Sequence, residues 1–167
     1  MSLYYPHGFN AEIVRHDVGS QRYRYTVVFV PEEVKAALPL GEYPKLRITG
    51  EVDDHPIEAA LIPLGSEHYI LLSKRLLGAI GKRVGDVVDI RFRIADQDAV
   101  EIPARLREAL ARVPAMADLW AQATPGKQRA LAHMVASAKR AETKNKRIEY
   151  VFAVLRGEID LLGKRLR

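Results

Sequence analysis

The order of apolar and polar positions divides the chain into a strand-rich first part and a helical second part. Six segments have the period-two alternation or the β-branched composition of strands, namely residues 9–14, 22–30, 45–53, 56–64, 68–72 and 87–94. From residue 103 onward, apolar residues recur at spacings of three and four, which predicts helices. The pattern therefore indicates an α+β protein with its strands first and its helices afterwards.

Two short helices are predicted between the strands. The first, Pro31–Leu38, begins with a proline and two glutamates, which are favoured at a helix N-terminus. The second, Ser73–Ile80, begins with an N-cap serine and is ended by Gly81. Each helix follows one strand and precedes another, so the order strand, helix, strand occurs twice.

These two segments match each other at a constant offset of 42 positions. Phe29, Pro31, Val34, Ala37, Leu38, Leu46 and Ile48 correspond to Leu71, Ser73, Leu76, Ala79, Ile80, Val88 and Ile90. One copy is too small to bury its own apolar face, so we predict that both copies share a core in a small pseudo-symmetric β-barrel. The predicted core contains Val28, Val30, Leu46, Ile48, Leu71, Val88, Ile90 and Phe92.

The two copies differ at the turn that precedes their last strand. Gly85-Asp86 in the second copy stands where the first has Tyr43-Pro44. Glycine adopts a positive φ without steric cost, and an aspartate carboxylate accepts hydrogen bonds from nearby backbone N–H groups. We therefore predict that Gly85 and Asp86 form a structural turn without a catalytic role.

The second part predicts a C-terminal bundle of about four α-helices. Apolar stripes at helical spacing occur after Pro103, before Ala123, after Thr124-Pro125 and before Gly157. Trp120 is expected to anchor the core of this bundle. Residues 95–102 form the expected boundary, so we predict a β-barrel domain over residues 1–98 and a helical domain over residues 99–167.

The charge is distributed unevenly between the two parts. Residues 1–102 hold 12 Lys/Arg and 15 Asp/Glu, and residues 103–167 hold 14 Lys/Arg and 6 Asp/Glu, so the formal charge of +5 arises from the helical part alone. The chain has no cysteine, which excludes disulfides and thiol catalysis, and no long apolar run. We expect a cytoplasmic protein that does not bind membranes.

Searches for catalytic and metal-binding patterns are negative. The five histidines, His7, His16, His55, His68 and His133, include no pair at the spacing of metal ligands on a helix. No nucleophile motif, phosphate-binding loop or dinucleotide fingerprint occurs. Asp53-Asp54-His55 is interpreted as an acidic turn, and Ser66 near His68 as a polar loop. We therefore predict no catalytic residue, no metal and no cofactor.

One basic pattern stands out in the helical part. If residues 129–147 form a single straight helix, a stripe of cations and one histidine lies on one face, formed by Arg129, His133, Arg140, Lys144 and Arg147. Such a stripe is a candidate contact for an anion or a nucleic-acid backbone. The alternative is an ordinary solvated face, in which Glu142 pairs with Lys146 and Arg147 faces another part of the protein.

Two motifs resemble those of a bacterial family. The passage LLSKRLLGAIGKRVGDVVDIRF is similar to the strand–helix–Gly-Asp–strand motif of small barrels, including AbrB-like transcription factors. Lys139, Glu142, Thr143, Arg147 and Ile148 match the Lys-x-x-Glu-Thr-x-x-x-Arg-Ile pattern of the YdeI/OmpD-associated, or bacteriocin-protection, proteins. The resemblance extends from about Phe9 to Gly157. It implies a double-split (swapped-hairpin type) barrel followed by a helical domain, a protective role with no established activity, and motif residues of unknown role.

Three hypotheses about function follow. The first is a non-enzymatic binding or interaction protein, consistent with stress or bacteriocin protection. The second is a nucleic-acid-binding protein that uses the basic helices, with an acidic protein as the other possible partner class. The third is a small-molecule receptor or enzyme with its site between barrel and helices, although no reacting group is identified.

Overall fold

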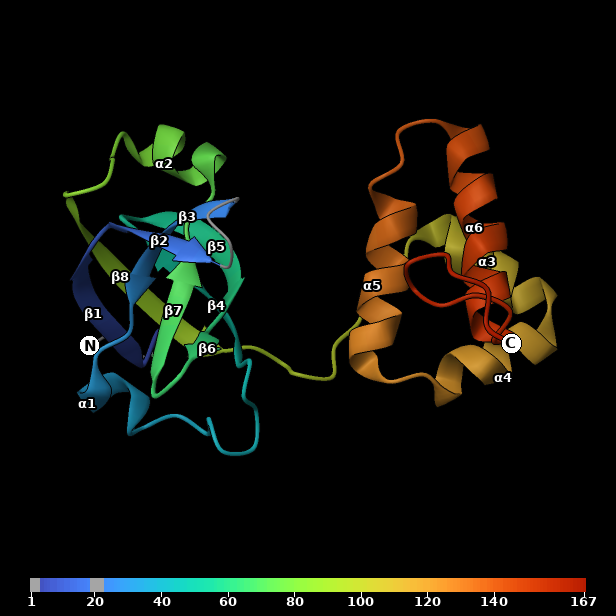
Figure 1. The fold of residues 1–167 in the computed structure, drawn as a ribbon, viewed down its shortest axis with the longest axis horizontal. Helices are drawn as coiled ribbons and strands as arrows, with labels where there is room; N and C mark the ends of the chain where they lie inside the picture. The colour runs from blue at the N-terminus through green and yellow to red at the C-terminus, as the bar shows by residue number, and fades with distance from the viewer. Residues whose placement is uncertain (1–3, 19–22) are drawn as a thin grey trace. The chain divides into compact units, whose positions relative to one another are not determined.

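The computed structural model describes residues 4–18 and 23–167, which form two compact units (Figure 1). The first unit comprises residues 1–97, and the second comprises residues 98–167. Strands are the main elements of the first unit, and helices are the main elements of the second. The predicted α+β class is therefore confirmed.

The first unit contains eight strands and two short helices among its described residues. The strands are β1 (His7–Glu12), β2 (Val14–Val18), β3 (Tyr23–Phe29), β4 (Arg47–Val52), β5 (His55–Ala60), β6 (Ile62–Leu64), β7 (Glu67–Leu71) and β8 (Val87–Ile94). The helices are α1 (Glu32–Lys35) and α2 (Lys74–Ile80). Figure 1 shows these two helices at opposite ends of the unit.

The strands form two open sheets, so the predicted closed barrel is wrong. One antiparallel sheet has the order β1-β8-β4-β5, and the other has the order β2-β3-β7-β6. Closure would require pairing between the edge strands of the two sheets, but the described strands show none. The chain passes from the first sheet to the second at Leu61, between β5 and β6.

The chain passes from one sheet to the other four times, and at two of these passages a single buried residue joins the two strands. Ile13 lies between β1 and β2, Leu61 lies between β5 and β6, and both side chains are fully buried. The N–H of Ile13 donates to the carbonyl of Asp86 at 2.8 Å, and the N–H of Gly85 donates to the carbonyl of Ile13 at 2.8 Å. The Gly85-Asp86 turn thus holds one of these two corners.

The register of the two central strand pairs reproduces the 42-residue offset found in the sequence. Val28 of β3 pairs with Ile70 of β7, and Gly50 of β4 pairs with Phe92 of β8. Both pairs are antiparallel and are separated by 42 positions, so exchanging the two copies maps each ladder onto itself. This geometry is that of a pseudo-two-fold axis passing through both ladders.

The two sheets share one apolar core, and most of the predicted core residues lie in it. Val28, Val30, Leu46, Ile48, Val88, Ile90 and Phe92 are all buried. Leu71 is the exception, because its side chain is 39% exposed while that of its neighbour Ile70 is buried. The prediction for Leu71 was wrong because the continuous apolar run from Tyr69 to Leu72 conceals which side chains face inward.

The second unit packs four helices around its own core. These are α3 (Ala104–Arg112), α4 (Pro114–Gln122), α5 (Pro125–Ala136) and α6 (Ala141–Leu155), which bring the described chain to six helices. Trp120 packs in this core with residues from all four helices, including Leu106, Leu131, Val135, Val151 and Phe152. Among the described residues, no helix is both long and apolar enough to cross a membrane.

We predict that Gly50→Ala destabilises the first unit by about 2 kcal/mol or more, because β4 approaches β8 too closely for a side chain. A Cβ at Gly50 would lie 2.2 Å from the carbonyl oxygen of Arg91. Urea unfolding followed by the NMR signals of β8 measures the effect. Gly78→Ala is the control, since a Cβ there meets no atom within 4 Å. Equal stability of the two variants would refute the prediction.

Candidate functional site

The basic residues predicted to lie on one straight helix are divided between two helices. Helix α5 ends at Ala136, and α6 begins at Ala141 with Arg140 as its extended N-cap. Arg129 and His133 therefore belong to α5, whereas Lys144 and Arg147 belong to α6. The condition for the stripe, one straight helix over residues 129–147, is therefore not met. Residues 137–140 form a connection in which the hydroxyl of Ser137 donates to the carbonyl of Met134 at 3.2 Å.

Arg147 joins the two helices. Its Nη1 donates to the carbonyl oxygen of Met134 at 2.6 Å and to the hydroxyl of Ser137 at 2.8 Å. Met134 lies in the last turn of α5, where carbonyl groups lack partners within the helix and a nearby cation is favourable. Arg147 thus stabilises the end of α5, and its guanidinium is already engaged in hydrogen bonds.

The other predicted contact residues differ in their exposure. Arg129 is half-buried, and its Nη1 lies 3.5 Å from the carbonyl of Ala99, so it is engaged within its own unit. His133, Lys139 and Arg140 are exposed, and Lys144 is half-buried. We refer to His133, Lys139, Arg140 and Lys144 as the basic cluster. Within the described chain, none of its members forms an ion pair.

The remaining motif residues lie in the first turn of α6. Glu142 is exposed, Thr143 is half-buried, and the proposed ion pair between Glu142 and Lys146 does not form in the described structure. The side chain of its N-cap residue, Arg140, forms no capping hydrogen bond. The first N–H groups of this 15-residue helix therefore add a partial positive charge next to the basic cluster.

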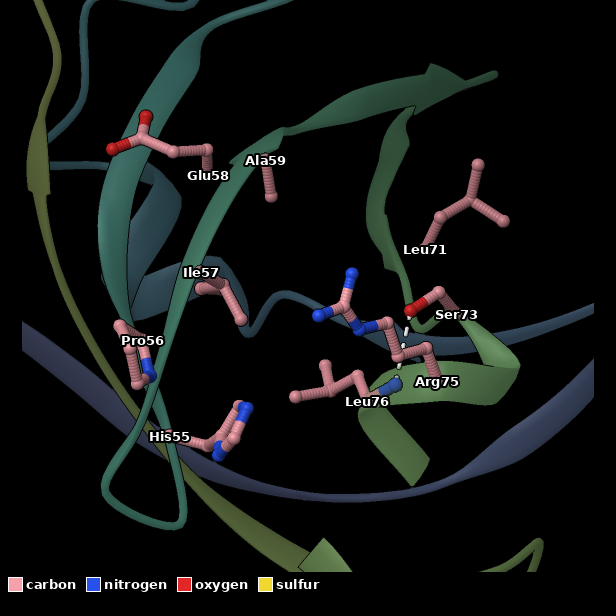
Figure 2. Close-up of a pocket in the computed structure, with 9 residues that line it drawn as sticks. All are labelled: His55, Pro56, Ile57, Glu58, Ala59, Leu71, Ser73, Arg75 and Leu76. Carbon is pink, nitrogen blue, oxygen red and sulfur yellow. Dashed lines mark hydrogen bonds between the residues drawn. The ribbon is translucent and has the colours of Figure 1, made fainter. Parts of the chain in front are cut away.

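A pocket that the sequence did not reveal lies in the first unit, between β5, the end of β7 and the start of α2 (Figure 2). Its volume is about 360 Å³, and its lining residues are His55, Pro56, Ile57, Glu58, Ala59, Leu71, Ser73, Arg75 and Leu76. Figure 2 shows the guanidinium of Arg75 directed into the space between the two strands, with Ile57 opposite it. Arg75 is exposed and forms no ion pair with any described residue.

The acidic turn beside this pocket has a structural role. Asp53 and Asp54 connect β4 to β5 with φ angles of 45° and 64°, as in the tight two-residue turns of hairpins. The carboxylate of Asp53 accepts a hydrogen bond from the N–H of Asp89 at 2.8 Å and pairs with Lys82 Nζ at 2.8 Å. Burial works against ionisation, but these hydrogen bonds and the Lys82 charge outweigh it and lower the pKa of Asp53.

Ser66 and His68 do not form a nucleophile–base pair. The carbonyl of Ser66 accepts a hydrogen bond from the buried Lys35 Nζ at 2.6 Å, and Lys35 also pairs with Glu32 at 2.6 Å. His68 Nδ1 is buried without a hydrogen-bond partner. Burial and the charge of Lys35 lower the pKa of His68, which favours the neutral imidazole. The described residues also contain no group of three His, Asp or Glu side chains that could hold a metal.

We predict that Arg147→Ala destabilises the second unit by about 1.5–3 kcal/mol, because it removes two hydrogen bonds from a charged donor. The fluorescence of Trp120, the only tryptophan, reports unfolding of this unit in urea. Lys146→Ala is the control, because Lys146 is exposed and unpaired among the described residues; its effect should stay within about 0.5 kcal/mol. An equally small effect of Arg147→Ala would show that the guanidinium does not stabilise α5.

We also predict that Asp53 makes the free energy of unfolding of the first unit depend on pH. Because the pKa of this carboxyl is lowered on folding, the unfolded chain takes up the proton first as the pH falls. Its stabilising contribution is present above about pH 4 and is lost as the pH falls further through the folded-state pKa. Asp53→Asn should therefore flatten the acid limb of a plot of unfolding free energy against pH. Asp54→Asn serves as the control, and parallel curves for wild type and Asp53→Asn would contradict the assignment.

Comparison with known families gives two matches. A model described as a domain of unknown function (DUF1905) matches residues 9–92. A model described as "Bacteriocin-protection, YdeI or OmpD-Associated" matches residues 99–157. The first match lies within the strand-rich unit, and the second lies within the helical unit. A search of curated proteins found no match.

Proposed function

We propose that this chain is a non-enzymatic binding protein that contacts nucleic acid through its helical unit. It belongs to the family of the domain of unknown function (DUF1905), whose model matches half of the chain, and its helical unit matches the YdeI/OmpD-associated, bacteriocin-protection family. The family description names a protective phenotype and no reaction. The proposed contact is the basic cluster where α5 meets α6. Arg147 joins the two helices at this junction. Arg129, on α5, is engaged with the carbonyl of Ala99 and is not part of the proposed contact.

The observation that carries the proposal is the lack of ion pairs in the basic cluster. Lys139, Arg140 and Lys144 form none with the described residues, although Glu142 lies between them in sequence. Residues 103–167 have a formal charge of +8. Unpaired cations attract phosphates and release bound counterions, and this effect supplies most of the affinity in sequence-independent binding.

The type of nucleic acid follows from the composition of the basic cluster. It contains no Phe, Tyr or Trp side chain on which an unpaired base could stack. Cations and the free N–H groups at the start of α6 suit contacts to a phosphate backbone. We therefore propose that duplex nucleic acid binds without sequence preference and that single strands bind more weakly.

We predict that the chain binds a short DNA duplex at low salt, with a log–log salt slope of about −0.9 for each phosphate contact. Arg140→Gln combined with Lys144→Gln should reduce the slope by about two contacts. Fluorescence anisotropy at several salt concentrations measures both quantities. The matched control is Arg112→Gln combined with Lys164→Gln, which removes the same charge from exposed positions in the same unit.

Three outcomes would contradict this proposal. The first is the absence of binding at low salt. The second is an equal loss in the test and control variants, which would indicate attraction to the overall charge alone. The third is displacement of the duplex by poly-glutamate at a similar charge concentration, which would point to an acidic protein as the partner.

A further inference from the structure

The pocket of the first unit points to a second binding function that is independent of nucleic acid. We propose that it binds the C-terminal end of a short peptide, with the carboxylate on Arg75 and the peptide amide groups on the open edges of β5 and β7. Three features support this assignment: the backbone groups at the two edges, the unpaired guanidinium, and the size of the apolar lining.

The edge of β5 presents free backbone groups to the pocket. β5 is the last strand of its sheet and pairs only with β4 among the described strands. The N–H of Leu61 donates to the carbonyl of Leu46 at 2.8 Å, and ladder bonds alternate along an antiparallel strand. The backbone N–H and carbonyl groups of Ala59 and Ile57 therefore point toward β4, and those of Glu58 point outward. Pro56, which has no N–H, occupies another outward position, as expected on an edge strand.

The end of β7 presents a second open edge. Leu72 N–H donates to the carbonyl of Thr26, and Val30 N–H donates to the carbonyl of His68, both at 2.9 Å. By the same alternation, the backbone groups of Leu71 point away from β3. β6 begins at Ile62, which pairs with Tyr69, so no residue of β6 lies opposite Leu71. Leu71 and Glu58 thus offer unpaired backbone groups on two walls of one pocket, which suits an added extended segment.

The charge of the pocket favours a carboxylate. Arg75 supplies a planar set of donors that matches a carboxylate in two parallel hydrogen bonds. The only acidic lining residue, Glu58, is held by the hydroxyl of Thr49 at 3.1 and 3.2 Å, and Figure 2 shows its carboxylate away from Arg75. Ser73 Oγ accepts a hydrogen bond from the N–H of Leu76 at 3.1 Å, which leaves its O–H free to donate.

The size of the pocket limits the ligand to a few residues. A volume of about 360 Å³ lies near the lower end of the range for small-ligand sites, roughly 300–1,000 Å³. Ile57, Ala59, Leu71 and Leu76 form its apolar walls. Leu71 is 39% exposed, and a small apolar side chain of the peptide would cover it. The same chemistry occurs in a free di- or tripeptide and in the C-terminal tail of a partner protein.

The test is an NMR titration of the full chain with N-acetyl-leucyl-alanine as the free acid and as its C-terminal amide. The acid should shift the amide signals of Glu58 and Leu71, and the amide form should bind at least about tenfold more weakly. The same two residues at the C-terminus of a carrier protein form a second arm. Binding of both arms identifies a protein tail as a ligand, and binding of the free acid alone identifies a small peptide.

Two variants assign the roles of side chain and backbone. Arg75→Gln should weaken binding of the acid at least about tenfold, and Lys74→Gln should not, because Lys74 is adjacent, exposed and outside the lining. Glu58→Pro removes the outward N–H together with the carboxylate and should also weaken binding, whereas Glu58→Ala removes the carboxylate, keeps the N–H and should bind normally. No signal shift at millimolar acid, equal binding of acid and amide, or full affinity in both Arg75→Gln and Glu58→Pro would overturn the proposal.

Discussion

The close approach of β4 to β8 at Gly50 and Phe92 is the contact on which the first unit depends. Phe92 is fully buried, and its ring contacts those of His7 and Phe9 at centroid distances of 5.2 and 6.4 Å. A Cβ at Gly50 would lie 2.7 Å from Phe92 Cβ, so only glycine allows the strands to meet this closely. This pair also lies on the pseudo-two-fold axis that relates the two copies of the strand–helix–strand segment.

The pocket results from the same architecture. Because the central pairs are β4–β8 and β3–β7, the outer strands β5 and β6 belong to different sheets although they are adjacent in sequence. The chain passes from β5 of one sheet to β6 of the other at the buried Leu61, and the edges of β5 and β7 are not paired with each other. A closed barrel would satisfy these edges internally. The open arrangement leaves backbone groups available at the place where Arg75 is directed into the pocket.

The sequence predicted those features that depend on local periodicity. The 42-residue offset reflects apolar positions that repeat because both copies face one core, and most core residues could be named from it. Leu71 was misassigned because a continuous apolar run does not reveal which side chains face inward. The apolar stripes indicated two separate helices here, but the basic stripe required one straight helix over residues 129–147, and the break at residues 137–140 does not meet that condition.

The pocket had no signal in the sequence for a physical reason. Its walls come from residues 55–59, from Leu71 and from Ser73, Arg75 and Leu76, and no motif joins these segments. Arg75 resembles any exposed arginine on a short helix until the fold places it between two open strand edges. The sequence did locate the basic residues of the second unit, because an excess of charge is visible in composition alone.

The two units have separate proposed tasks, with polyanion contact in the helical unit and peptide-end recognition in the strand-rich unit. The most direct test is chemical-shift mapping of the full chain with a short DNA duplex. We predict shifts at residues 133–144 and unchanged amide signals at Glu58 and Leu71. Shifts centred on β5, β7 and α2, with residues 133–144 unaffected, would contradict this division of tasks.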